Sequence, residues 1–171
     1  MAWFGSQSSP LEWEDINDIM MTHRAAMGAV DGVADSMSAY VRMTIGSGKA
    51  KIKMALYDTS ANLIGETDEI EPTVGTAAWV TATFSAPKPS LTAGVLYQLV
   101  VITDNILVQI GVTGRQLKPP YWNRHDHIAY EDAFEDPATW ADSNASLSIY
   151  CTYTETPHVV PILGKGTMWT P

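Results

Sequence analysis

Two histidines in the segment 115–144 are the residues whose spacing most resembles a metal site. His125 and His127 are separated by one residue, and Asp132 follows shortly after them. In an extended chain, alternate side chains point the same way, so the two imidazoles could share one ion with a carboxylate completing its coordination. Neighbouring histidines in a polar loop are more often without a ligand. The spacing therefore supports a transition-metal site only as a weak hypothesis.

The same segment also contains the residues best suited to binding a glycan. Carbohydrate sites combine a flat aromatic side chain, on which the CH face of a pyranose stacks, with nearby polar groups that bind its hydroxyls. Segment 115–144 supplies both kinds of group in Tyr121, Trp122, Asn123, Arg124, Asp126 and Trp140. Tyr130 and Phe134 add two further rings. In the alternative interpretation, Trp122 and Trp140 are packing residues that close one end of the fold.

No group of residues predicts catalysis. Cys151 lies in the alternating stretch SLSIYCTYT, where it shares a strand face with Leu147, Ile149 and Tyr153, so we expect a buried structural thiol. Acidic pairs occur near residues 131 and 135, but a glycosidase pair needs a defined separation across a cleft. Nucleophile-elbow, phosphate-loop and dinucleotide motifs are absent from the sequence. We therefore expect a protein that is not an enzyme and that uses no catalytic cofactor.

Large apolar side chains gather near both ends of the chain, where no regular period is present. In residues 1–17 and 158–171 they are interrupted by serine, proline and glycine. We expect these segments to be extended arms, because aromatic residues are favoured at the centres of protein interfaces. The candidate assembly contacts are Trp3, Phe4, Trp13, Leu163, Met168 and Trp169. Alternatively, residues 1–17 pack on their own domain.

Between the arms, the chain alternates between apolar and polar residues in a manner typical of antiparallel strands. The clearest segments are 19–27, 33–45, 49–59, 77–85, 95–112 and 146–154, separated by short clusters of Gly, Asn, Ser and Pro. In the second segment, six residues are expected to point inward: Val33, Met37, Ala39, Val41, Met43 and Ile45. The stretch beginning at Val95 is apolar on both faces, which predicts a central strand. Residues 115–144 have no sustained period and are expected to form a long loop.

Three consecutive phrases carry a family resemblance: DGVADSMSAYVRM, GKAKIKMALYDTSANLIGET and AAWVTATFSAPKPSLTAGVLYQLVVITDN. In this order they resemble a jelly-roll module of bacterial surface and phage virion proteins that is similar to non-catalytic carbohydrate-binding domains. The resemblance covers about half of the chain. It implies a jelly-roll β-sandwich, which residues 18–157 would form as one domain, and it leaves a structural calcium ion as an alternative because such modules often hold one.

Charge and composition narrow the classes of partner. The net charge is −9, and the ten lysines and arginines form no basic block, so nothing would neutralise a row of phosphates and we expect no nucleic-acid partner. No apolar run approaches the roughly 20 residues of a membrane span, so we expect no membrane partner. The first residues lack the basic and apolar regions of a secretory signal.

These observations lead to two functional hypotheses. The first is a structural protein of a virion, such as a phage head-decoration or tail-associated module, made in the host cytoplasm and assembled through its arms with its own copies or other virion proteins. The second is an extracellular carbohydrate-binding module or lectin-like adhesin that binds glycan through residues 115–144. The expected fold is a single, all-β, jelly-roll-like antiparallel sandwich with extended N- and C-terminal arms.

Overall fold

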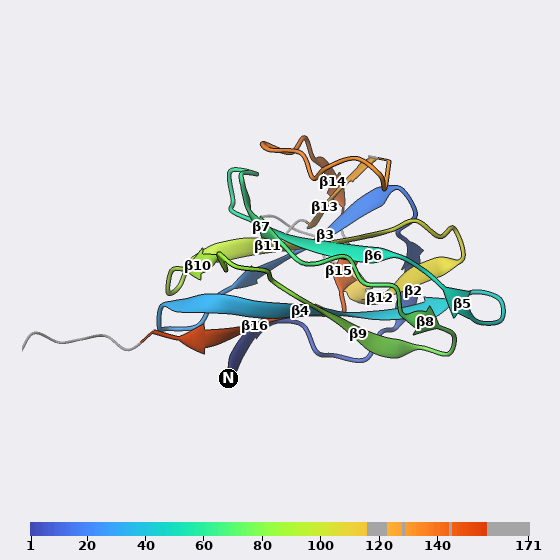
Figure 1. Ribbon diagram of the computed structural model, residues 1–171, viewed down its shortest axis with the longest axis horizontal. Coiled ribbons are helices and arrows are strands. Elements are labelled where there is room, and N and C mark those ends of the chain that lie inside the picture. Colours follow the sequence, from blue (N-terminus) through green and yellow to red (C-terminus); the bar gives the residue numbers. More distant parts are fainter. Residues whose placement is uncertain (116–122, 128, 144, 157–171) are drawn as a thin grey trace, which may run out of the picture.

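The computed structural model describes residues 1–115, 123–127, 129–143 and 145–156, and these residues contain no helix. They form sixteen strands (Figure 1). The strands are β1 Ala2–Gly5, β2 Glu12–Asp15, β3 Ile19–Ala26, β4 Gly32–Met43, β5 Gly48–Lys49, β6 Ile52–Tyr57, β7 Leu63–Glu66, β8 Thr73–Val74, β9 Ala78–Thr83, β10 Ser90–Leu91, β11 Leu96–Thr103, β12 Val108–Arg115, β13 Asn123–His127, β14 Ala141–Ser143, β15 Ala145–Leu147 and β16 Ile149–Glu155.

The strands form two main antiparallel sheets that pack face to face (Figure 1). The first sheet has eight strands in the order β1-β16-β4-β12-β15, with β9 and β10 on β4 and with β2 on β12. The second sheet has six strands in the order β14-β13-β3-β11-β6-β7. A short ribbon of β5 and β8 lies at one end. The fold is therefore an antiparallel β-sandwich, as the sequence predicts.

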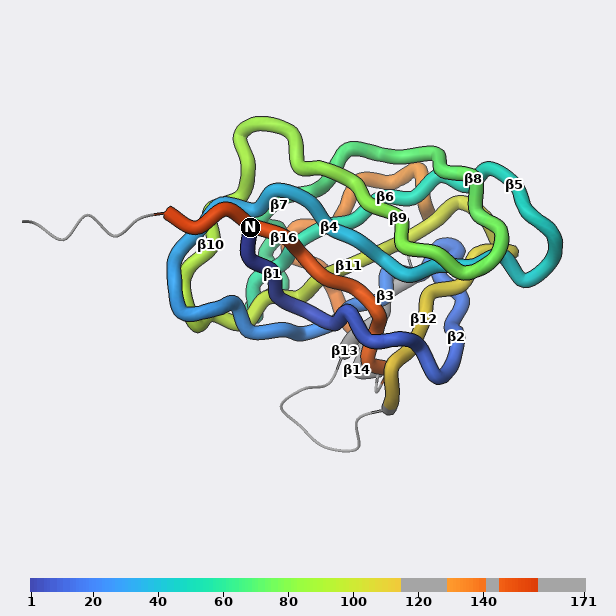
Figure 2. The backbone as a smooth tube through the Cα atoms, turned by 90° about the horizontal axis from the view of Figure 1, so that it is seen from below, coloured from blue at the N-terminus to red at the C-terminus, as the bar shows by residue number. Residues whose placement is uncertain are grey.

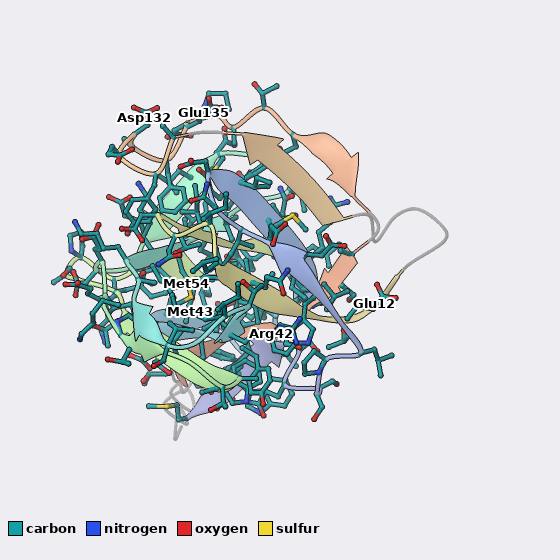
Figure 3. The ribbon with its side chains drawn as sticks, turned by 90° about the vertical axis from the view of Figure 1, so that its right-hand side faces the viewer. Glu12, Arg42, Met43, Met54, Asp132 and Glu135 are labelled. Atoms are coloured by element: carbon teal, nitrogen blue, oxygen red, sulfur yellow. The ribbon has the colours of Figure 1, made fainter. Side chains whose placement is uncertain are left out.

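The main core lies between the two sheets and is built from alternate residues of the long strands. Met43 of β4 and Met54 of β6 lie between the sheets, one from each layer (Figure 3). The face predicted around Cys151 is confirmed, because this thiol is fully buried together with Leu147 and Ile149 of the neighbouring positions. β11 is confirmed as central, since it pairs with β3 on one side and with β6 on the other.

The inward face of β4 differs from the prediction at both ends of the strand. Met37 and Val41 are buried as expected, but at the start of the strand Ala34 is buried and Val33 is only half-buried. The cause is an irregularity in the pairing with β16, between Thr152 and Tyr153, which changes the inward-facing set by one residue. Ile45 lies beyond the end of β4 and is 74% exposed.

The N-terminal segment is not an irregular arm, because it adds two edge strands to the first sheet. β1 pairs with β16, and β2 pairs with β12 (Figure 2). Four-residue strands are too short to show a convincing alternation, and the Ser-rich stretch with Pro10 between them hides the pattern. The close approach of Pro10 to the sheet needs a glycine opposite, since a Cβ at Gly111 would lie 2.7 Å from the Pro10 Cβ. The alternative interpretation, in which residues 1–17 pack on their own domain, describes the structure.

The segment 115–144 is also more regular than expected. It contains β13 and β14, which pair with each other and extend the second sheet beyond β3. Between these two strands, residues 129–140 cross the outer face of the second sheet (Figure 1). We call residues 129–140 the covering segment. The molecule therefore has a third layer on one side, and that layer has no counterpart on the outer face of the first sheet among the described residues.

Candidate binding face

Five aromatic side chains form a continuous row on the outer face of the first sheet. They come from five different strands, in each of which alternation places one aromatic side chain on the outer face of the sheet. The residues are Trp3 of β1, Trp13 of β2, Tyr40 of β4, Trp79 of β9 and Tyr150 of β16. We call this surface the aromatic face.

The rings of the aromatic face contact one another in sequence across the sheet. Trp3 and Tyr150 meet edge to face with centroids 6.4 Å apart, and Tyr150 meets Trp79 at 5.0 Å. Trp79 then contacts Tyr40 at 5.1 Å, and Tyr40 stacks on Trp13 at 6.0 Å. These separations lie in the range of favourable aromatic pairs. The row is consequently a preorganised surface and not a set of independent side chains.

A polar network fixes the Trp13 end of the row. The guanidinium carbon of Arg42 lies 4.3 Å from the centroid of the Trp13 ring, within the distance of a cation–π interaction. Arg42 Nε and Nη2 donate to the side-chain oxygen of Gln109 at 3.2 and 3.0 Å. Gln109 Nε2 in turn donates to Asp15 Oδ1 at 2.9 Å. The charged side chains of Arg42 and Asp15 are thus held in fixed positions at this end of the row.

Hydroxyl groups occupy the remainder of the same outer face. The Ser36 and Thr152 hydroxyls are 2.7 Å apart, and the Ser38 and Thr81 hydroxyls are also 2.7 Å apart. Ser38 is 1% exposed, so its hydroxyl is closed to a partner, whereas Thr81 is exposed and Ser36 and Thr152 are half-buried. A hydroxyl has one donor and two acceptor positions, so these three retain capacity for a further hydrogen bond. The outer face therefore places flat rings near three hydroxyls that can bind either a protein backbone or a sugar.

The aromatic face is open to solvent at its centre and at its N-terminal end. Trp79 is 37% exposed and Trp3 is 50% exposed, while the other three rings are partly buried by their neighbours. An aromatic side chain that is exposed on an outer sheet face lacks the hydrophobic stabilisation that it would have in the core. A contiguous patch of this kind is typical of a site of interaction.

The aromatic residues of the covering segment have the opposite environment. Tyr130 and Phe134 are 4% and 5% exposed, in a second apolar cluster on the outer face of β3, β11 and β6. Lys53 Nζ lies under both rings, 4.8 Å from the Tyr130 centroid and 5.1 Å from the Phe134 centroid. The same ammonium donates to the Asp132 carbonyl oxygen. These two aromatic residues are therefore core residues and offer no face to a glycan.

A hollow of about 320 Å³ lies beside the covering segment, and the groups that line it are largely paired with one another. Lys51 forms an ion pair of 3.2 Å with Glu69. The Tyr130 hydroxyl donates to the other Glu69 oxygen at 2.9 Å. The Tyr130 hydrogen bond and then the Lys51 ammonium lower the pKa of Glu69. Burial lowers the pKa of Lys53. This arrangement fastens the covering segment to the sheet.

Two buried titratable groups lie in the core, away from both surfaces. His23 of β3 is 8% exposed and burial lowers its pKa to about 4, while its Nδ1 lies 3.5 Å from the Ser146 hydroxyl. Burial raises the pKa of the Cys151 thiol, which keeps it protonated and unreactive.

The predicted assembly residues have three different outcomes: two lie on the surface, one lies in the core and three lie outside the described residues. Trp3 and Trp13 lie on the aromatic face. Phe4 points the opposite way along β1 and is 3% exposed, packed against the rings of Tyr97 and Tyr153, so it cannot serve as a surface contact. The C-terminal candidates lie outside the described residues: Leu163, Met168 and Trp169.

The predicted glycan and metal residues are only partly described. Tyr121 and Trp122 lie outside the described residues. The backbone of Asn123, Arg124, His125, Asp126 and His127 forms β13. Trp140 is half-buried and meets the Tyr57 ring edge to face at 5.2 Å, and Asp132 is exposed. Among residues whose side chains are described, no three metal-ligating groups come together. The described residues also include no helix that could span a membrane.

Sequence reasoning missed Tyr40, Trp79 and Tyr150 as members of one site. Each of them occupies an outward position of an alternating strand, and this orientation could be predicted from the sequence. Their proximity could not be predicted, because it depends on the pairing of β4 with β9 and of β4 with β16.

No protein-family model matches the chain. A comparison with curated proteins also finds no match. The jelly-roll resemblance and its implied partners therefore stay predictions, and the function must be argued from the geometry of the two outer faces.

Proposed function

We propose that this protein is a non-enzymatic structural protein that assembles through its aromatic face. The observation that carries the proposal is the uncovered row of three tryptophans and two tyrosines on the outer face of the first sheet. Tryptophan and tyrosine are the residues most enriched at the energetic centres of protein interfaces. The proposal keeps the predicted role of Trp3 and Trp13 and assigns it to a sheet face.

The biological setting that we propose is a virion, in which the protein is a phage head-decoration or tail-associated component made in the host cytoplasm. This part rests on the family resemblance of the strand and turn phrases. An acidic surface with a net charge of −9 suits a component that must stay soluble before it assembles.

Substitution of Trp79 tests assembly directly. We expect Trp79→Ser to weaken self-association by at least about 2 kcal/mol, roughly 30-fold in the dissociation constant, because the ring is central in the row. Sedimentation velocity over a range of concentrations measures the effect. Ile106→Ser is the matched control, since Ile106 is 74% exposed and has no ring partner on the aromatic face. Equal association of the wild type and the Trp79 variant contradicts the proposal.

Glycan binding is the second candidate function, and the hydroxyls beside the rings are the observation that favours it. We place it on the aromatic face because Tyr130 and Phe134 of the covering segment are buried against the second sheet. If a pyranose stacks on Trp79, Trp79→Ser should weaken glycan binding by about 1–3 kcal/mol. A broad glycan array and titration of the best ligand measure this. An array with no bound glycan at high protein concentration speaks against this candidate.

A further inference from the structure

We infer that the aromatic face of one copy receives the C-terminal segment, residues 157–171, of a second copy. This inference rests on the proposed assembly function and names the partner of that site. Three observations support it: the place where the described chain ends, the length and composition of the segment that follows, and the charge of the rest of the molecule.

The described chain ends at the opposite end of the first sheet from β2. β16 runs away from Trp13 and ends at Glu155, and the Thr156 amide still donates to the Asp31 carbonyl oxygen at 2.9 Å (Figure 2). Tyr150 lies six residues before Thr156 on β16, a distance of about 20 Å along a strand. The described chain therefore ends at an edge of the aromatic face, with β16 directed away from the centre of that face.

The direction of the chain at Thr156 favours another copy over the same copy. Pro157 follows immediately, and a residue before proline is restricted to extended conformations. To cover its own aromatic face, the chain would have to reverse at this point. The fifteen residues 157–171 can span up to about 50 Å when extended, which is long enough to cross the face of a neighbouring molecule.

The composition of the segment complements the aromatic face. It contains six apolar side chains suited to packing on aromatic rings: Val159, Val160, Ile162, Leu163, Met168 and Trp169. It carries Lys165 and no acidic residue, so all 19 acidic side chains of the chain belong to residues 1–156. Two aromatic faces brought together would oppose two strongly acidic bodies. The C-terminal segment itself brings no acidic group onto the face, which favours it over a face-to-face pairing of two copies.

A contact of this kind is heterologous, because each copy donates one segment and accepts another. Heterologous contacts propagate into rings when the rotation between copies closes and into filaments when it does not. Each variant that removes one half of the contact should leave the other half intact. The two halves can therefore be separated and then recombined in solution.

A mixing experiment with the full-length chain tests the inference. Trp79→Ser removes the accepting face, and the double substitution Leu163→Ser with Trp169→Ser removes the donated segment. We expect each variant alone to be monomeric and an equimolar mixture to form a species with the mass of two chains, by sedimentation velocity or light scattering. We also expect at least a tenfold weaker association for each variant alone than for the wild type. Thr170→Ala is the matched control within the segment, and Trp3→Ser replaces Trp79→Ser if that variant does not fold.

The outcomes separate this inference from the proposed function. If the segment variant assembles like the wild type while the face variant is monomeric, the face is an assembly site but the segment is not its partner. If the two monomeric variants do not combine, the segment and the face do not meet, and the inference is wrong. If the face variant assembles like the wild type, or if the wild type is monomeric at every concentration, the proposed function fails as well.

Discussion

His23 illustrates how the position of one residue in a strand sets its electrostatics. The residue lies on β3 opposite Leu99 of β11, on the face of the second sheet that points into the core. His23 is 8% exposed and its Nδ1 lies 3.5 Å from the Ser146 hydroxyl, so a charged imidazole would be poorly solvated there. The His23 imidazole is therefore neutral in the folded protein.

We expect the free energy of unfolding to fall as the pH decreases through the range 6.5 to 4. The folded-state pKa of about 4 lies below the unfolded-state value of 6.5, so the unfolded chain binds the proton more tightly. Stability from this group is complete above pH 6.5, and linkage gives a loss of about 2 kcal/mol by pH 5 and about 3 kcal/mol by pH 4. Urea unfolding at each pH, followed by tryptophan fluorescence, measures the change.

His23→Gln provides the control for this pH dependence. Carboxylates such as Asp35 and Glu69, whose pKa values are lowered in the folded state, also lose stabilising interactions in acid. Their contribution is common to both proteins and cancels in the comparison. A His23→Gln variant with the same slope between pH 6.5 and 5 as the wild type would show that His23 does not carry the effect.

At the scale of elements, the covering segment is held by apolar packing together with hydrogen bonds to the second sheet. Phe134 contacts the Tyr57 ring edge to face at 6.4 Å, and backbone bonds join the segment to the sheet, including the Ala138 amide to the Ala61 carbonyl at 2.9 Å. The Tyr57 hydroxyl donates to the Glu135 carbonyl at 2.8 Å. Asp132 and Glu135 lie at the outside of the molecule, beyond the second sheet (Figure 3). The covering segment thus shields the outward side chains of β6 and β11 from solvent.

We expect Phe134→Ala to lower the free energy of unfolding by about 2–4 kcal/mol, because it leaves a cavity under the covering segment. Chemical denaturation measures the global effect. Hydrogen exchange measures the local effect, with faster exchange at the Ala138 amide. Ala133→Ser is the matched control, since Ala133 is the exposed neighbour of Phe134. Unchanged exchange at Ala138 in the Phe134 variant would contradict a packing role for the ring.

The sequence predicts the long strands well because alternation over seven or more residues is a strong signal. β11 lies within its predicted segment, β4 begins one residue before its segment and β16 ends one residue after its own. The double-sided apolar pattern of β11 correctly indicates a central strand. The short strands β1, β2, β13 and β14 are different. Each has five residues or fewer, and each is defined by its pairing partner far away in sequence.

The candidate site was predictable only in part for the same reason. Trp3 and Trp13 were predicted as contacts from their size and position near the N-terminus. The covering segment could not be predicted from composition, since aromatic residues in an irregular stretch are equally consistent with a binding loop and with a lid over a sheet. Tyr130 and Phe134 are lid residues because the outward side chains of β6 and β11 beneath them, such as Tyr57 and Val100, are apolar.

At the scale of the whole molecule, the two outer faces of the sandwich differ in how far they are covered. The covering segment buries the outer face of the second sheet, whereas the described residues leave Trp3 and Trp79 exposed on the outer face of the first sheet. A sandwich that needed only stability would gain by burying both. The uncovered side is therefore the side on which we expect a partner, and the covered side gives that surface a rigid support.

The position of β16 has a mechanical consequence. This strand is flanked on one side by β1 and on the other by β4, with antiparallel ladders along most of its length. A tensile load applied beyond Thr156 along the strand axis would stress both ladders in shear, so many hydrogen bonds would share the force at once. A load applied at Met1 along the same axis would stress only the ladder between β1 and β16, because this ladder is the one pairing of β1 among the described strands. If the C-terminal segment links neighbouring copies, the tether is anchored on a strand that is held by two ladders.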